Sequence, residues 1–147
     1  MSQRDNVNNT QMVFLGTLTL SGTTPAASDW VDTRGFDSAT IVVKTNTVTD
    51  AGTAEGFSFV VQEGDDSTAA GASAVADAEL IGSDLTVTAD GDDDKLIGGI
   101  GYIGSKRYVR IEGTGTTGTN AGVDIYACLA HPAEAATTFV GTSVAAT

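Results

Sequence analysis

The side chains that most often carry out catalysis are scarce in this chain and form no catalytic pattern. The single histidine, His131, precedes Pro132 at the end of a predicted strand, and the single cysteine, Cys128, lies inside that strand. A general base needs a partner and a pocket, and a reactive thiol needs electropositive surroundings. We therefore expect His131 to be a surface residue and Cys128 to be a small, buried or half-buried strand residue. No catalytic site is expected, and the chain is not predicted to be an enzyme.

Two acidic clusters and one glycine-rich stretch could be taken for ligand sites. Asp65–Asp66 and the cluster at residues 90–94 offer carboxylate oxygens, but no glutamate follows the second cluster where a calcium loop would close. We expect solvated turns at both. The stretch GGIGYIG at residues 98–104 does not open a helix, as a dinucleotide loop must, and its glycines are typical of a bulge or a close backbone approach. No metal or cofactor site is predicted.

The basic residues form the one cluster that points to a partner. Three of the seven lie within five positions of one another, interleaved with a tyrosine, in a chain whose formal net charge is −12. An anionic partner surface could dock there. The alternative is that Arg110 only pairs with Glu112 or with an acidic neighbour on the adjacent strand. The candidate partner-contact residues are Tyr102, Lys106, Arg107, Tyr108, Arg110 and, near the N-terminus, Arg4.

The charge balance also excludes some partners. Nineteen acidic residues against seven basic ones repel nucleic-acid phosphates and anionic membrane surfaces, so neither is a predicted partner. The sequence has no apolar run of about 18 residues and no apolar centre of a signal peptide near its N-terminus. We expect synthesis in the cytoplasm of the cell that makes the chain.

The composition predicts one all-β domain. A chain of 147 residues with 41% hydrophobic residues can bury a core without disulfides or metals. Eighteen glycines, two prolines and many threonines and valines favour short strands over helices. Residues 12–132 are expected to form a β-sandwich. Residues 1–11 are expected to be a flexible arm, and residues 133–147 a tail in which residues 137–140 could add an edge strand.

Two alternating segments are predicted to lie at the centre of a sheet and to carry the basic cluster. In residues 106–112, Val109 and Ile111 fall on one face and Tyr108, Arg110 and Glu112 on the other. Residues 123–129 alternate in the same way. The glycine- and threonine-rich residues 113–120 are expected to join the two strands as a long hairpin.

The remaining pattern predicts an antiparallel sandwich, most simply a jelly roll of about eight strands. The first predicted strand, residues 12–20, places Phe14, Leu18 and Leu20 on one face, opposite Thr17 and Thr19. A loop is expected at residues 47–56 and a short helical turn within residues 74–80. The other predicted strands are residues 29–32, 38–46, 57–63, 79–82 and 85–88, and residues 95–103 run into the two central segments.

Four motifs in this order resemble the small β-rich head proteins of tailed bacteriophages. They are DWVD at residues 29–32 with GFDSAT at 35–40, FSFVVQEGDDS at 57–67, YIGSKRYVR at 102–110, and LAHP at 129–132. The resemblance covers residues 28–132 and does not extend to the N-terminal arm or the alanine-rich tail.

This resemblance implies a capsid decoration, or cement, protein. Such a subunit would bind the major capsid protein on the outer surface of the expanded virion shell and stabilise it. It is expected to be a homo-oligomer, with a trimer favoured. Two alternatives remain. One is a carbohydrate-binding sandwich in which Trp30, Tyr102 and Tyr108 form a stacking platform, and the other is a different virion part, such as a tail or fibre subunit.

Overall fold

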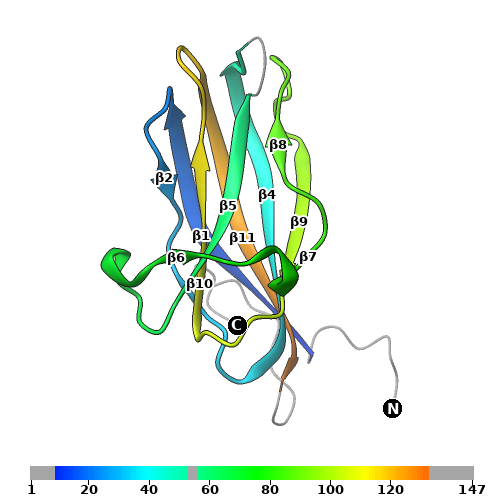
Figure 1. Cartoon of the computed structure of the whole chain (residues 1–147). Coiled ribbons are helices and arrows are strands. Elements are labelled where there is room, and N and C mark those ends of the chain that lie inside the picture. The colour runs from blue at the N-terminus through cyan, green and yellow to red at the C-terminus, as the bar shows by residue number, and fades with distance from the viewer. Residues whose placement is uncertain (1–8, 53–55, 133–147) are drawn as a thin grey trace.

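A computed structural model, which describes residues 9–52 and 56–132, shows two antiparallel β-sheets packed face to face (Figure 1). Two 3-10 helices, η1 (Ala69–Gly71) and η2 (Asp77–Glu79), lie in the connections. The strands are β1 (Thr10–Ser21), β2 (Ala26–Ala27), β3 (Val31–Asp32), β4 (Phe36–Asp50), β5 (Phe57–Gly64), β6 (Ser73–Ala74), β7 (Leu80–Ile81), β8 (Thr86–Val87), β9 (Leu96–Tyr102), β10 (Tyr108–Thr114) and β11 (Asn120–Pro132).

The order of the strands is that of a jelly roll, as predicted. The first sheet runs β1-β11-β4-β9-β7, and the second runs β2-β10-β5-β6 with β3 also on β10 and β8 also on β5. In an eight-stranded jelly roll the first strand pairs with the last, the second with the seventh, the third with the sixth and the fourth with the fifth. All four pairings are present if β2 and β3 count as one interrupted strand and β6 and β8 as another. The short β7 extends the edge of the first sheet.

The core lies between the sheets and is built from the inward residues of alternating strands. Phe57, Phe59 and Val61 of β5 are buried, as predicted, and so are alternate residues of β10, beside β5 in the same sheet, and of β11 in the facing sheet. Removing this much aliphatic and aromatic surface from water is the main stabilising contribution to such a fold. The outward residues of the same strands are therefore free to form surfaces.

The predicted hairpin between residues 106–112 and 123–129 is wrong. β10 pairs with β2, β3 and β5 in the second sheet, whereas β11 pairs with β1 and β4 in the first. The connection crosses from one sheet to the other and is held by the turn after β1, because Gly115 N donates to Gly22 O at 3.1 Å. Alternation identifies the inner face of a strand but not the strands that pair with it. Each of the two strands does lie inside a sheet, but the two sheets are different ones.

Phe14 does not lie on the inner face of β1. Phe14 pairs with Tyr126 and Gly16 with Ile125, so Leu15 is an extra residue on β1. This β-bulge turns Leu15 inward, where it is 1% exposed, and leaves Phe14 outside at 38%. Gly16 adopts a φ of +106°, a conformation that strongly favours glycine.

The loop predicted at residues 47–56 begins later than expected, because β4 continues to Asp50. The end of β4 is covered by side chains of the acidic loop at residues 90–94. Asp93 Oδ1 accepts a hydrogen bond from Val48 N, and Asp90 Oδ1 accepts one from Ala51 N, each at 2.7 Å. The acidic turn is thus more than a solvated one, because its carboxylates take up backbone groups that no neighbouring strand reaches.

The expected helical turn within residues 74–80 is limited to η2. β1 begins at Thr10, two residues before the predicted start of that strand. Residues 1–8 of the predicted arm and the whole tail, including its possible edge strand at residues 137–140, lie outside the described residues.

Candidate functional site

A one-residue bulge brings Trp30 to the outer face of the second sheet. Glu112 of β10 pairs with Ala27, and Val109 pairs with Val31, so three residues between β2 and β3 face two residues of β10. Ser28 continues the ladder there, because its N–H donates to Ile111 O at 2.8 Å and its Oγ accepts from Ile111 N at 3.1 Å. Without the extra residue, Trp30 would oppose Val109 and point into the core.

Arg110 lies against this tryptophan. Its guanidinium carbon is 4.6 Å from the centroid of the Trp30 ring, a cation–π contact, and its Nε donates to Gln62 Oε1 at 2.8 Å. The expected pairing of Arg110 with Glu112 or another carboxylate is not what the structure shows, because Arg110 has a neutral amide as its partner on the adjacent strand. None of the ion pairs among the described residues includes Arg110.

Arg107 and Tyr108 lie next to this contact, but Arg107 already has an acidic partner. Arg107 donates from Nε to Asp32 Oδ1 at 3.0 Å and from Nη2 to Oδ2 at 2.7 Å, and its guanidinium carbon lies 4.9 Å from the Tyr108 ring centroid. Lys106 pairs with Asp65 at 2.7 Å. The hydrogen bond from Arg107 lowers the pKa of the Asp32 carboxyl, although partial burial opposes the shift. We call Trp30, Gln62, Tyr108 and Arg110 the Trp30–Arg110 surface.

The Asp32–Arg107 pair gives a testable acid dependence. The folded-state pKa of Asp32 is lowered, so its contribution to stability is fully present above the unfolded-state pKa and is lost as the pH falls through the folded one. We expect Arg107→Gln to raise the pKa of Asp32 toward its ordinary value. We also expect the stability difference between wild type and variant to shrink at low pH. NMR titration of the Asp32 carboxyl carbon, with urea unfolding at neutral and acidic pH, measures both.

Arg34→Gln is the matched control for this prediction. The charge of Arg34 lowers the Asp32 pKa only weakly, and the backbone N–H of residue 34 continues to donate to Asp32 Oδ1 at 3.0 Å after the substitution. Its effect on the Asp32 titration should therefore be the smaller one. Equal shifts in the two variants would show that the ion pair with Arg107 is not the cause.

Tyr102 is not part of this surface, in contrast to its prediction as a contact residue. It is 5% exposed, and its hydroxyl donates to Glu63 Oε2 at 2.6 Å and accepts from Lys106 N at 2.9 Å. Burial and the bond to Glu63 raise the pKa of Tyr102. Because Tyr102 lies on β9 and Glu63 on β5, this bond joins the two sheets. The predicted platform of Trp30, Tyr102 and Tyr108 is therefore not assembled.

The other predicted site residues are placed as follows. Arg4 lies outside the described residues. His131 is exposed and Cys128 is half-buried, as expected, and burial raises the pKa of the Cys128 thiol. The predicted bulge in the glycine-rich stretch is present, because the register of β9 shifts between Gly98 and Leu96. Gln62 was not predicted, although its place on the outer face of residues 57–63 could have suggested it.

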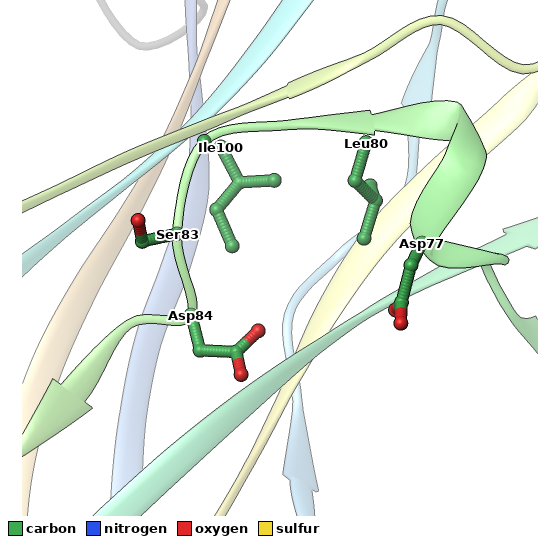
Figure 2. Close-up of a pocket in the computed structure, with 6 residues that line it drawn as sticks. Asp77, Leu80, Ser83, Asp84 and Ile100 are labelled. Carbon is green, nitrogen blue, oxygen red and sulfur yellow. The ribbon is translucent and has the colours of Figure 1, made fainter.

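A separate hollow of about 390 Å³ lies beside β7 (Figure 2). Leu80 and Ile100 form its apolar wall, and Asp77 and Asp84 stand at its rim. Across residues 9–52 and 56–132, no three histidine, cysteine or acidic side chains come close enough to hold a metal ion. Its lining holds two carboxylates and the hydroxyl of Ser83 but no histidine, lysine or arginine, and this combination indicates no particular chemistry for the hollow.

The sequence matches no known protein-family model, and it matches no curated protein. The fold, a two-sheet β-sandwich, therefore stands on the structure, and no relative identifies the chain as a phage decoration protein. In the described part of the chain, no helix is long and apolar enough to cross a membrane.

Proposed function

We propose that this chain is a structural protein of a tailed bacteriophage virion that binds the outer surface of the expanded capsid and stabilises it. Its partner in this proposal is the major capsid protein, and the protein acts by binding, without catalysis. The order of the four sequence motifs supports the proposal, as does a rigid jelly-roll body that carries them. The subunit would be made in the host cytoplasm and would act as a homo-oligomer, with a trimer as the expected form.

The observation that carries the proposal is the Trp30–Arg110 surface. Tryptophan, tyrosine and arginine are the residues most enriched among those that dominate protein–protein binding energy. Arg110 is held in place by the Trp30 ring and by Gln62, and none of the ion pairs in the described part of the chain includes it. A partner carboxylate can pair with such a preorganised guanidinium at a small cost in side-chain entropy. On a chain with a net charge of −12, this position selects an acidic patch on the partner.

Binding of this kind would stabilise a capsid by linkage. A ligand that binds only the expanded shell lowers the free energy of that shell relative to other states. Because a capsid offers many equivalent sites, and because an oligomer can engage several of them, each contact can be modest. A small surface built around one arginine and one tryptophan is sufficient for that role.

The test is cosedimentation of the purified protein with bare expanded capsids of the phage that encodes it. We expect saturable binding at a fixed copy number per capsid. Arg110→Ala should weaken binding by about 30-fold, the effect of losing about 2 kcal/mol at a central contact. Arg110→Lys should lie between wild type and Arg110→Ala, because it keeps the charge but loses the flat stacking group.

Lys95→Ala is the control, because it removes the same charge from the acidic loop, where Lys95 pairs with Asp92. It should bind like wild type, and thermal unfolding should show that every variant is folded. No binding of the wild type at micromolar concentration would refute the capsid role. Equal binding of wild type and Arg110→Ala would instead remove the Trp30–Arg110 surface from the contact.

A further inference from the structure

The outer face of the first sheet is uncharged at its centre. Two rows of side chains cross its strands, as the register of β1, β11, β4, β9 and β7 shows. The first row contains Met12, Cys128, Thr40, Gly101 and Ile81. The second contains Phe14, Tyr126, Val42 and Gly99. We call these nine residues the neutral face.

Several apolar groups on and beside this face are open to solvent. Phe14 is 38% exposed, and its ring lies 5.2 Å from that of Tyr126. Ile81 is 60% exposed at one edge, and the neighbouring Ile103 is 58% exposed. Between these isoleucines and β4 lies a groove of about 320 Å³ whose lining includes Gly99 and Gly101, and the exposed Asp37 is the one charged residue of that lining. Exposed apolar side chains that share one face commonly mark an interaction site.

Charged side chains begin only at the border of the neutral face. In the next row, Asp124 of β11 is the register partner of both Thr17 and Lys44. The Asp124 carboxylate accepts hydrogen bonds from Thr17 Oγ1 at 2.5 Å and from Asn46 Nδ2 at 2.9 Å. An apolar centre with a satisfied polar border is the usual composition of a protein–protein interface.

We propose that the neutral face is buried against a second copy of this chain. Two molecules that each carry a net charge of −12 repel each other, so they can associate closely only where carboxylates are absent. A face without charge offers nothing to select an acidic or basic foreign partner, but it matches itself. A flat face that is its own complement can pack about a two-fold axis. In a trimer, the neutral face of one copy would meet a different surface of the next.

The size of the first sheet is sufficient for such a contact. The neutral face with one bordering row on each side extends over about 26 Å along β11, and the five strands, spaced by about 4.8 Å, extend over about 24 Å, which gives at most roughly 600 Å² per copy. Two copies would bury up to about 1,200 Å², the lower end of the range for specific interfaces. This inference rests on the self-association in the proposed function, but it does not depend on capsid binding, which is measured separately.

The test is the solution mass of the full chain by sedimentation equilibrium between 1 and 100 µM. We expect a dimer or trimer whose association strengthens with salt, because salt screens the repulsion between copies. Val42→Lys should weaken association at least 30-fold. The matched control is Val60→Lys, since Val60 is 46% exposed on the outer face of the second sheet. It should associate like wild type, and both variants should unfold near the wild-type temperature.

Alkylation of Cys128 gives a second readout, because this half-buried thiol lies on the neutral face. Its rate should fall as the protein concentration rises. A wild type that stays monomeric at 100 µM in high salt would overturn the proposal, and so would a Val42→Lys variant that associates like wild type. A thiol protected equally at every concentration would also overturn it, because a segment of the same chain would then cover the face. Each of these outcomes is distinguishable from a failure to bind capsids.

Discussion

Replacing Gly56 with alanine is expected to destabilise the fold by about 3–5 kcal/mol. Gly56 is buried, has a φ of +60° and precedes β5 at the point where β8 pairs with it. A Cβ atom there would lie 1.9 Å from Val87 O and 2.9 Å from Val87 C. The obstacle is backbone, so the methyl group cannot be accommodated by a side-chain rotation. Urea unfolding followed by circular dichroism measures the loss.

Gly35→Ala separates the steric part of this effect from the conformational part. Gly35 also has a positive φ, +93°, but no atom lies within 4 Å of the position where its Cβ would be. It should therefore cost only the left-handed conformation, about 1–2 kcal/mol. If the two substitutions cost the same, the close approach of Gly56 to β8 does not contribute to stability.

Thr45→Val is expected to cost about 2–3 kcal/mol, although valine has nearly the same shape. Thr45 is fully buried, its hydroxyl donates to Asp92 O, and its Oγ1 accepts from Lys95 N at 2.9 Å. Valine would leave the carbonyl of residue 92 and the N–H of residue 95, which are partly buried at these hydrogen bonds, without this partner. The acidic loop would then hold the end of β4 less firmly, so the amides of Val48 and Ala51 should exchange with deuterium faster than in wild type.

Thr47→Val is the control for this prediction, because Thr47 is an exposed residue of the same strand. It should change stability by less than about 0.5 kcal/mol. Slow amide exchange at Val48 in the Thr45 variant, together with wild-type stability, would show that the carboxylates of the loop hold β4 without the threonine.

The all-β class of the fold could be predicted from the sequence because it depends mainly on one signal, the alternation of apolar and polar residues along each strand. Period-two alternation identified the inner faces of β4, β5, β10 and β11, and short strands separated by glycine-rich turns indicated a sandwich. The same signal says nothing about which strands are neighbours, so β10 and β11 were wrongly paired. It also fails at a bulge, where one additional residue reverses the face. Phe14 was assigned to the face of Leu18 and Leu20 for that reason.

The candidate site was predicted in part, for related reasons. The cluster of basic residues was visible as composition, and Arg107, Tyr108 and Arg110 do lie close together. Trp30 reaches Arg110 only through the bulge between β2 and β3, which depends on the register of three segments far apart in sequence. Tyr102 was misplaced because an aromatic residue with a hydroxyl suits a contact surface and a buried hydrogen bond equally well.

The position of β11 has a consequence for how this chain folds as it is made. β11 is the last strand of the described chain, yet it lies inside the first sheet, between β1 and β4 (Figure 1). Thr10 of β1 pairs with Ala130 of β11, so this pair can form only after Ala130 has emerged from the ribosome. Until then β1 has both of its edges unpaired, and pairing over such sequence separation is slow. Folding should therefore follow completion of the chain, and a product that stops before Asn120 should aggregate.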